Sequence, residues 1–357
     1  MLTVTKSLFP DSDPAAGRKP VYAYKLENDN GMSVTALTYG GIISDVRVPD
    51  RLGRIESVVL GFDDLKDYAA NPGLYFGAIV GRTAGRITKA KFHIGKKKYK
   101  VPANENGNAL HGNGEYSTAY WNAQTLVEQD RVLVSFEYTS PDDKNGYPGE
   151  VKNIITYALS QDNNLTITYE AASDETTVLN LTNHTYFNLS GGIRNDVTQH
   201  HIKADFPSFL ELGEGNLPTG NILPAKDTPF DFSGTGHPIY DGVASEHPQN
   251  VLVKNGYDHP FVFDKDKDHT LVMSDPASGR ILTLTTDYPV LVMYTGNYID
   301  SSVTVRNVPG MKYMGVALEA QLYPDAMNHP DTFEPYTLEA GKAYSHSTTW
   351  SFKTDVD

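Results

Sequence analysis

Alternation of apolar and polar residues with a period of two is the pattern that most limits how this chain can fold. It runs through 131–139 (RVLVSFEYT), 151–159 (VKNIITYAL) and 165–170 (LTITYE). Side chains of a β-strand point alternately to its two faces, so the pattern is typical of strands with one buried face. The turn-forming residues 161–164 (QDNN) separate the last two segments and predict a hairpin.

Other segments also favour strands over helices. Residues 281–294 (ILTLTTDYPVLVMY) predict two strands that are interrupted at 287–289, and 343–352 predict another strand near the C-terminus. Only 63–70 (DDLKDYAA) indicates a helix, of one or two turns with an aspartate cap at its start. The 30 glycines and 21 prolines supply the turns that many short strands require.

No internal repeat and no shift in composition divides the 357 residues. All-β folds of this length commonly form one domain, so we expect a single all-β domain over 1–357, built from large antiparallel sheets with few short helices. Segment 207–249, rich in Gly and Pro, is predicted to be a long irregular loop; a domain boundary there is the alternative.

The composition excludes several kinds of chemistry. Because the chain has no cysteine, it has no disulfide, thiolate nucleophile, thiolate zinc site or iron–sulfur cluster. The motifs GxGxxG, the Walker lysine loop, GxSxG and HExxH are also missing from the sequence. We therefore expect a function without cofactor and without metal.

The charge and the hydropathy pattern limit the partners. The 44 acidic and 30 basic side chains give a net charge of −14, which repels nucleic acid. No apolar run approaches the length of a membrane span, and the first twenty residues lack a signal-peptide pattern. The prediction is a cytoplasmic protein with a small-molecule partner; no pattern in the sequence specifies a homodimer.

Two charged segments have an alternative functional interpretation. Six lysines in 89–100 (KAKFHIGKKKYK) could form an anion-binding patch, but a solvated hairpin that turns at 95–96 is favoured. Residues 264–268 (DKDKD) begin like a calcium loop, yet His269 stands at its glycine position and no glutamate closes it. A solvated turn is expected there.

Segment 181–189 (LTNHTYFNL) is the first candidate for a functional site. Read as one strand, it places Thr182, His184, Tyr186 and Asn188 on one face and apolar residues on the other. A core face would not collect four polar groups, so a functional role of the histidine is weighed equally with a structural one.

Segment 314–321 (MGVALEAQ) is the second candidate. Glu319 shares a strand face with Gly315 and Ala317, and these small residues are expected to leave open volume beside the carboxylate. A surface glutamate is the alternative. Further polar candidates in glycine-bracketed segments or turns are Arg82, Arg86, His111 and Asp258.

In combination, these segments resemble the aldose 1-epimerase, or galactose mutarotase, family. The resemblance implies a β-supersandwich and the interconversion of the α and β anomers of free hexoses such as galactose and glucose. The blocks occur in the family's order, from about residue 37 to the C-terminus. They are LGFDDL (60–65), GRTAGRI (81–87), LHG (110–112), TNHTYFNL (182–189), GYDHPF (256–261), YTGN (294–297) and LEAQ with PDAMN (318–321, 324–328).

The resemblance also implies roles for single residues. His184 matches the family's general acid and Glu319 its general base, whereas Arg86, His111 and Asp258 match residues that hold sugar hydroxyls. From unperturbed pKa values the expected pair is an ionised glutamate and a protonated histidine, and nearby carboxylates are expected to keep the imidazolium charged near neutral pH.

Three departures from the family pattern are expected to lie in the pocket wall and to affect sugar preference. Gly85 stands where many members have Asn, Val292 where some have Gln, and Asn113 where a second glycine is usual. The alternatives are a mutarotase for maltose or a hexose 6-phosphate, a silent sugar-binding module, or a glycoside hydrolase using Glu319 and Asp258.

Overall fold

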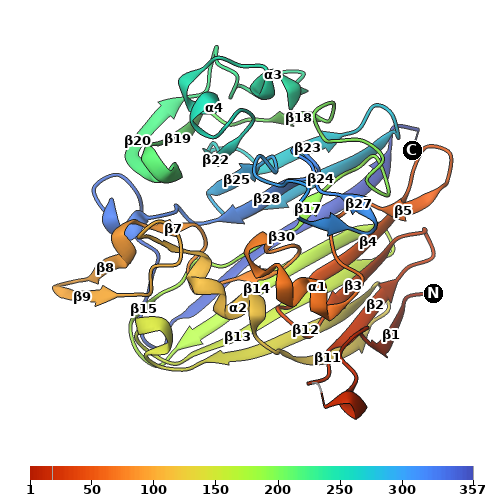
Figure 1. Ribbon diagram of the computed structural model, residues 1–357, viewed down its shortest axis with the longest axis horizontal. Coiled ribbons are helices and arrows are strands. Elements are labelled where there is room, and N and C mark those ends of the chain that lie inside the picture. Colours follow the sequence, from red (N-terminus) through yellow and green to blue (C-terminus); the bar gives the residue numbers. More distant parts are fainter. Residues whose placement is uncertain (18, 357) are drawn as a thin grey trace.

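Antiparallel strands dominate the computed structural model, which describes residues 1–17 and 19–356. Its largest sheet has nine strands, and the long ones cross the middle of the molecule (Figure 1). In sheet order these are β11 (Asn122–Val127), β12 (Arg131–Ser140), β13 (Val151–Ser160), β14 (Asn164–Ser173), β30 (Ala343–Thr354), β24 (Arg280–Thr286), β23 (Thr270–Ser274), β18 (His201–Ala204) and β21 (His237–Pro238).

Two further sheets complete the main framework. The N-terminal sheet has five strands in chain order: β1 (Thr3–Leu8), β2 (Tyr22–Glu27), β3 (Ser33–Leu37), β4 (Ile43–Pro49) and β5 (Ile55–Ser57). The third sheet has the order β17 (Tyr186–Phe187), β28 (Val316–Gln321), β25 (Val290–Tyr294), β22 (Asp258–Val262), β19 (Ser208–Leu212) and β20 (Pro218–Pro224). This six-stranded sheet carries much of the site described below.

Short elements connect the sheets. Five two-stranded pairs are β6 (Ile79–Val80) with β16 (Thr182–Asn183), β7 (Arg86–Ile87) with β10 (Ala109–Leu110), β8 (Lys91–Ile94) with β9 (Lys97–Lys100), β15 (Thr177–Val178) with β29 (Thr337–Leu338), and β26 (Thr304–Val305) with β27 (Val308–Pro309). The α-helices are α1 (Leu65–Ala70), α2 (Glu115–Thr118), α3 (Tyr240–Val243) and α4 (Pro248–Leu252). Among the described residues, none of the helices has the length and apolar character that crossing a membrane requires.

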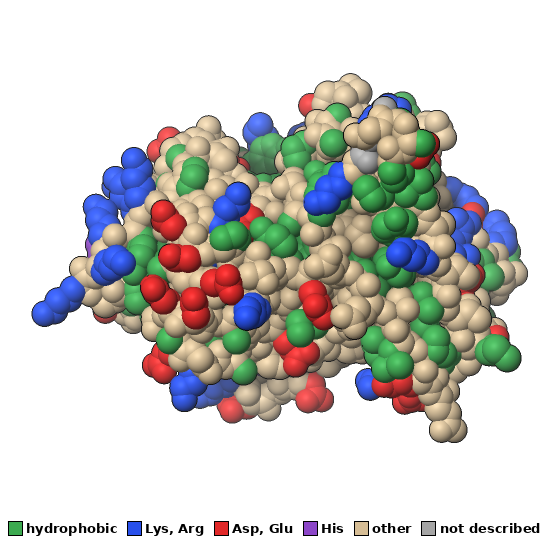
Figure 2. All heavy atoms as spheres, turned by 90° about the horizontal axis from the view of Figure 1, so that it is seen from below, with side chains coloured by type: hydrophobic (Ala, Val, Ile, Leu, Met, Phe, Trp, Pro, Cys, Tyr) green, Lys and Arg blue, Asp and Glu red, His purple; other side chains and the backbone are tan. Residues whose placement is uncertain are grey.

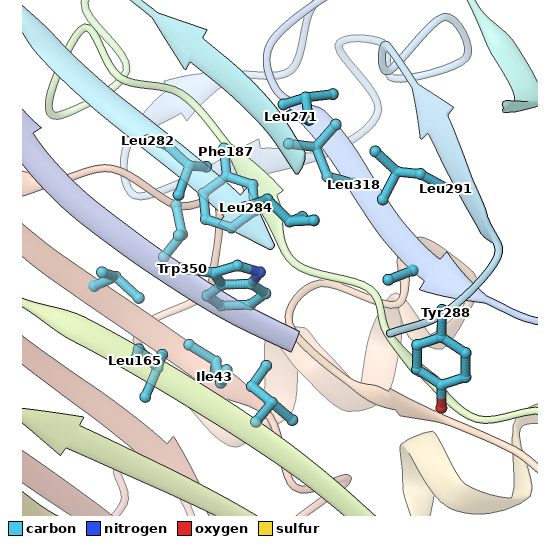
Figure 3. Close-up of a cluster of buried hydrophobic side chains, with 14 of the residues drawn as sticks. Ile43, Leu165, Phe187, Leu271, Leu282, Leu284, Tyr288, Leu291, Leu318 and Trp350 are labelled. Atoms are coloured by element: carbon cyan, nitrogen blue, oxygen red, sulfur yellow. The ribbon is translucent and has the colours of Figure 1, made fainter. Parts of the chain in front are cut away.

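The largest hydrophobic core lies between the sheets. Figure 3 shows Ile43 of the N-terminal sheet, Trp350 of the nine-stranded sheet and Leu318 of the six-stranded sheet in one cluster. The ring of Phe187 packs edge-on against Trp350 with a centroid distance of 4.8 Å. The apolar faces that the period-two pattern predicts are therefore buried against one another.

The structure confirms most of the predicted elements. Segments 131–139, 151–159 and 165–170 are β12, β13 and β14, and the last two form the predicted hairpin. Segment 281–294 breaks into β24 and β25 as expected, although the two strands belong to different sheets. In α1 the N-terminal cap is Asp64, whose side chain accepts a hydrogen bond from the backbone N–H of Asp67.

The prediction of a long irregular loop over 207–249 is wrong. This segment contains β19 and β20, two strands of the six-stranded sheet, and also the short elements β21 and α3. Because β20 is the edge strand of its sheet, it tolerates the proline and glycine residues that hid its strand pattern.

The lysine-rich segment 89–100 forms the predicted hairpin. Strands β8 and β9 pair with Ile94 opposite Lys97, so that the turn falls at Gly95 and Lys96. The hairpin projects from one end of the molecule in Figure 1, and basic side chains gather at that end in Figure 2. Residues 264–268 form an exposed turn, also as predicted.

Candidate active site

A cavity of about 450 Å³ opens between the six-stranded sheet and the surrounding loops. Its volume lies within the range of about 300–1,000 Å³ that is typical of clefts for small molecules. The structure brings all five predicted site residues to its wall: Arg86, His111, His184, Asp258 and Glu319. They come from β7, the turn after β10, the segment between β16 and β17, β22 and β28, which are distant in the sequence.

Three neighbouring strands form part of the cavity wall. Glu319 on β28 pairs with Val292 on β25, and Val292 pairs in turn with Pro260 on β22. All three residues line the cavity, and Asp258 stands two residues before Pro260 on the same strand face. The carboxylates of Glu319 and Asp258 are thus held on a rigid sheet rather than on loops.

The small residues before Glu319 do not leave the open volume that the sequence predicted. A side chain at Gly315 would have its Cβ 2.9 Å from Leu60 Cδ1 and 3.2 Å from Tyr186 Cβ. Ala317 is likewise buried in a hydrophobic cluster with both of these residues. Gly315 and Ala317 are small because Leu60 and Tyr186 pack against the strand there.

His184 lies between two short strands and not within one, so the prediction of a single strand over 181–189 is wrong. The Oδ1 atom of Asn183 accepts hydrogen bonds from the backbone N–H and the hydroxyl of Thr185, at 3.0 and 2.6 Å. This local turn ends β16, and β17 then begins at Tyr186 in another sheet. The turn places the imidazole of His184 in the cavity wall.

His184 and Glu319 form a buried pair. The distance from His184 Nε2 to Glu319 Oε1 is 3.4 Å, and the two side chains are 5% and 3% exposed. The remaining polar atoms, Nδ1 of the histidine and Oε2 of the glutamate, have no hydrogen-bond partner in the protein. The protein thus leaves two buried polar atoms of the pair without a hydrogen bond.

Burial controls the protonation of this pair. It raises the pKa of Glu319 to about 8, with the charge of Asp258 adding to the increase and Arg86 opposing it. It lowers the pKa of His184 to about 4. In the sugar-free protein at neutral pH the glutamate holds the proton and the histidine is neutral. The expectation of a charged imidazolium is wrong because desolvation is the main influence on the pKa of His184.

Aromatic rings surround His184 and explain its desolvation. The ring of Tyr75 stacks on the imidazole at a centroid distance of 5.7 Å, and the ring of Tyr186 lies 4.9 Å away. His111 approaches edge-on, at 5.3 Å. Sequence reasoning did not single out Tyr75, because nothing in its local sequence reports that it lies over a histidine more than a hundred residues later.

A backbone contact fixes the hydrogen-bonding role of His111. The N–H of Gly85 donates to His111 Nδ1 over 3.2 Å, so the proton of the neutral imidazole resides on Nε2. Burial lowers the pKa of His111, and the ring stays neutral.

Ligand atoms of His111, His184 and Glu319 lie within 4.8 Å of one another, which suits a metal ion geometrically. The Gly85 contact disfavours that use, because coordination through Nε2 would place a proton on Nδ1, facing the Gly85 N–H.

Two neighbouring residues hold the remaining predicted site residues in place. Arg86 Nε and Nη2 donate to the two carboxylate oxygens of Glu105 at 2.6 and 2.9 Å. Asn216 Nδ2 donates to Asp258 Oδ2 at 2.8 Å. Burial raises the pKa of Asp258 to about 6, although Arg86 and Asn216 both lower it. Sequence reasoning missed Glu105 and Asn216, since both lie in loops without a motif.

The three departures from the family pattern have different locations. Gly85 and Val292 line the cavity, as predicted. A Cβ atom at Gly85 would lie 2.8 Å from Pro324 Cβ, so the backbone packs too closely there for a side chain. Asn113 does not line the cavity, which corrects that part of the prediction: its Nδ2 donates to the carbonyl of Pro102, and its φ of 60° is one that asparagine tolerates.

Comparison with known proteins gives the same family over nearly the whole chain. The model of the family described as "Aldose 1-epimerase" matches residues 22–351. The galactose mutarotase of Mus musculus is 36% identical over 356 residues, covering 99% of each chain, and that of Sus scrofa is 37% identical, covering 98% of each. The maltose epimerase of Levilactobacillus brevis is 32% identical and covers 94% of this chain and 96% of its own.

A solved structure agrees with these sequence relatives. The galactose 1-epimerase from Lactobacillus acidophilus NCFM superposes with a TM-score of 0.87 at 28% sequence identity, and the match covers 99% of both chains. The all-β fold with few short helices is thus that of galactose mutarotase-like proteins. The cavity and the sequence relatives lead to one conclusion: the chain belongs to the aldose 1-epimerase family and is an isomerase.

Proposed function

We propose that the cavity binds one neutral hexose, galactose or glucose, and that Glu319 and His184 move the protons that open and close its ring. The observation that carries this proposal is the buried pair, with 3.4 Å between His184 Nε2 and Glu319 Oε1 in the wall of a cavity large enough for a sugar. Binding alone does not require an acid and a base side by side.

The reaction needs two proton transfers at neighbouring oxygens of the sugar. Glu319 takes the proton of the hydroxyl on C1 while His184 gives one to the ring oxygen, and the bond between C1 and the ring oxygen breaks. The aldehyde end then rotates about the C1–C2 bond. Ring closure on the other face of the carbonyl returns both protons, so that nothing is consumed and no further reactant is needed.

One proton shared by the pair is sufficient for this cycle. The neutral pair, with a protonated Glu319 and a neutral His184, and the ionised pair differ only in where that proton lies. A sugar hydroxyl that donates to Glu319 favours the carboxylate, and a ring oxygen that accepts from His184 favours the imidazolium. Substrate binding therefore drives the pair from its resting form toward the reactive one.

The other three predicted residues would hold the sugar. The Nε2–H of His111 is a donor, because Gly85 occupies Nδ1. Arg86 supplies charge-assisted donors, and Asp258 accepts from hydroxyls. The substrate is proposed to be uncharged because carboxylates outnumber cations in the wall even while Glu319 is protonated. Glu105 and Asp258 line it with one guanidinium, that of Arg86, and no lysine is among its described residues.

Maltose is a second candidate substrate. Gly215 and Asn216, in the connection between β19 and β20, line one side of the cavity. One relative of this chain is a maltose epimerase. A second sugar unit would have to lie along this side.

We also propose that residues 1–357 form one domain and that the enzyme serves hexose metabolism in the cytoplasm. The shared core between the three sheets supports the first proposal. The net charge of −14 supports a partner that is a neutral small molecule, in preference to nucleic acid or an anionic membrane surface.

Polarimetry tests the proposed substrate. Fresh α-galactose, α-glucose, maltose and glucose 6-phosphate are each followed to anomeric equilibrium with the enzyme and, as control, with Glu319→Gln. The proposal expects acceleration for galactose or glucose, none for the phosphate, and a large loss in the variant. Acceleration restricted to glucose 6-phosphate would overturn the assignment of a neutral sugar.

A further inference from the structure

Arg86 is held from one side by a residue that belongs to no recognised motif. Glu105 accepts from Arg86 Nε at 2.6 Å and from Nη2 at 2.9 Å, a bidentate pair in which the side chains are only 19% and 27% exposed. Bidentate pairs fix the plane of a guanidinium as well as its position. Both residues line the cavity.

The pair determines which donors of Arg86 remain for a ligand. Because the guanidinium is planar and Glu105 occupies the edge formed by Nε and Nη2, Nη1 points away from Glu105. Among the described residues, no side chain or carbonyl accepts a hydrogen bond from Arg86 Nη1. This nitrogen is the one that the geometry leaves for a sugar hydroxyl.

Glu105 also limits the electrostatic effect of Arg86 on the proton-transferring pair. Arg86 lies near both Asp258 and Glu319, and its positive charge opposes the increase in their pKa values. The titratable and charged groups around Glu319 are His184 from the segment after β16, His111 from the turn after β10, Tyr169 from β14, Tyr186 from β17, Asp258 from β22 and Arg86 from β7. A carboxylate on Arg86 offsets the only fixed positive charge in this set.

The carboxylate of Glu105 is not needed to hold its own loop. The backbone of Glu105 pairs with Asn108 through hydrogen bonds in both directions, at 3.1 and 2.8 Å. The amide Nδ2 of Asn104 donates to the carbonyl of Leu110, and Asn104 Oδ1 accepts from the Leu110 N–H. The loop therefore keeps its shape when the side chain of Glu105 loses its charge.

We propose that Glu105 is a positioning residue for the anomer interconversion: it orients Arg86 so that Nη1 faces the sugar, and it shields Glu319 from the charge of Arg86. This inference rests on the proposed function of Glu319 and His184. Glu105 itself neither donates nor accepts a proton in the reaction.

The test compares Glu105→Gln and Glu105→Asp with the wild-type enzyme by polarimetry on α-galactose across pH 4–10. Glu105→Gln loses the charge-assisted pair, so kcat/KM is expected to fall roughly 3- to 30-fold, with most of the change in KM. The pKa of Glu319 should fall, and the loss of activity on the alkaline side should therefore begin at lower pH. Glu105→Asp keeps the charge and should restore the wild-type pH profile and part of the lost kcat/KM.

A matched control is Glu128→Gln. Glu128 also accepts from an arginine Nε, that of Arg131 at 2.5 Å, but on a surface turn outside the cavity wall. This variant should have the wild-type kcat/KM and pH profile.

Two results would overturn the role of Glu105: wild-type kinetics in Glu105→Gln, or an equal loss at every pH that Glu105→Asp does not restore. Failure of the proposed function looks different. In that case the wild-type enzyme does not accelerate anomer interconversion, or Glu319→Gln retains its rate.

Discussion

Two arginines of the same seven-residue segment, Arg82 and Arg86, have opposite surroundings. Arg82 is fully buried, and each of its three nitrogens donates to neutral oxygens, of Ser140, Pro141, Pro148 and Thr177. Arg86 lies in the cavity wall and uses only two nitrogens, both on one carboxylate. An arginine with all its nitrogens engaged fastens segments together, whereas one with a free nitrogen can bind a ligand.

The neighbouring residues His184 and Asn183 show a similar contrast. In the cavity, buried atoms of His184 and Glu319 lack partners. Outside it, a comparable buried group such as Asn183 is engaged by the protein itself. Incomplete satisfaction of buried groups costs stability, so we expect substitutions in the cavity to affect activity more than folding, and the reverse for Arg82.

The largest effect is expected for Glu319 and His184, the pair proposed to transfer protons. Glu319→Gln and His184→Asn should each lower the rate of anomer interconversion by about 10²- to 10⁴-fold, because each removes a general acid or base. The urea midpoint of unfolding should change little, since both side chains are incompletely paired. Polarimetry and a urea titration measure the two quantities; activity within about threefold of wild type would refute the assignment.

The next largest effect concerns stability. Arg82→Lys should lower the free energy of unfolding by about 3 kcal/mol, because an ammonium group cannot reach all the oxygens that the guanidinium binds. The remaining folded protein should keep wild-type kcat. Urea unfolding followed by circular dichroism measures the change, and a variant as stable as wild type would break the contrast between the two arginines.

The same substitution at Arg86 should have a smaller effect, and it should change kcat/KM rather than the free energy of unfolding. Arg86→Lys removes the bidentate geometry on Glu105 and should lower kcat/KM by roughly tenfold, with little change in stability. Polarimetry at several sugar concentrations measures it. If Arg86→Lys unfolds the protein and leaves kcat/KM intact, then Arg86 is a structural residue like Arg82.

Much of the fold could be predicted because its signals are local. The strands β12, β13, β14 and β24 alternate along their own sequence, and the cap of α1 lies beside its helix. Strand β20 was missed because it contains proline and glycine, which a strand tolerates at the edge of a sheet. That β20 is an edge strand is known only from the assembled sheet. The turn at His184 was missed because Asn183 can cap a turn or continue a strand with the same neighbours.

The common location of the five candidate residues could be predicted because they occur in ordered motifs, and all five line the cavity. Their partners could not be predicted. Glu105 binds Arg86, and Asn216 binds Asp258. Both partners lie in loops, and no sequence motif indicates which residue of such a loop contacts the cavity wall. The raised pKa of Glu319 could not be predicted either, because it follows mainly from burial in the folded protein and not from the residues adjacent in sequence.

The central claim is that Glu319 and His184 work as a pair that shares one proton. The pH dependence of kcat/KM for α-galactose tests it most directly, since this ratio reports the pKa values of the free enzyme. With a pKa of about 4 for His184 and about 8 for Glu319, activity should be highest between these two values, with a smaller step near pH 6 where Asp258 titrates. It should fall tenfold per unit well below pH 4, where the pair gains a second proton, and well above pH 8, where it loses its only one. Activity that continues to rise from pH 8 to 10 would contradict the account.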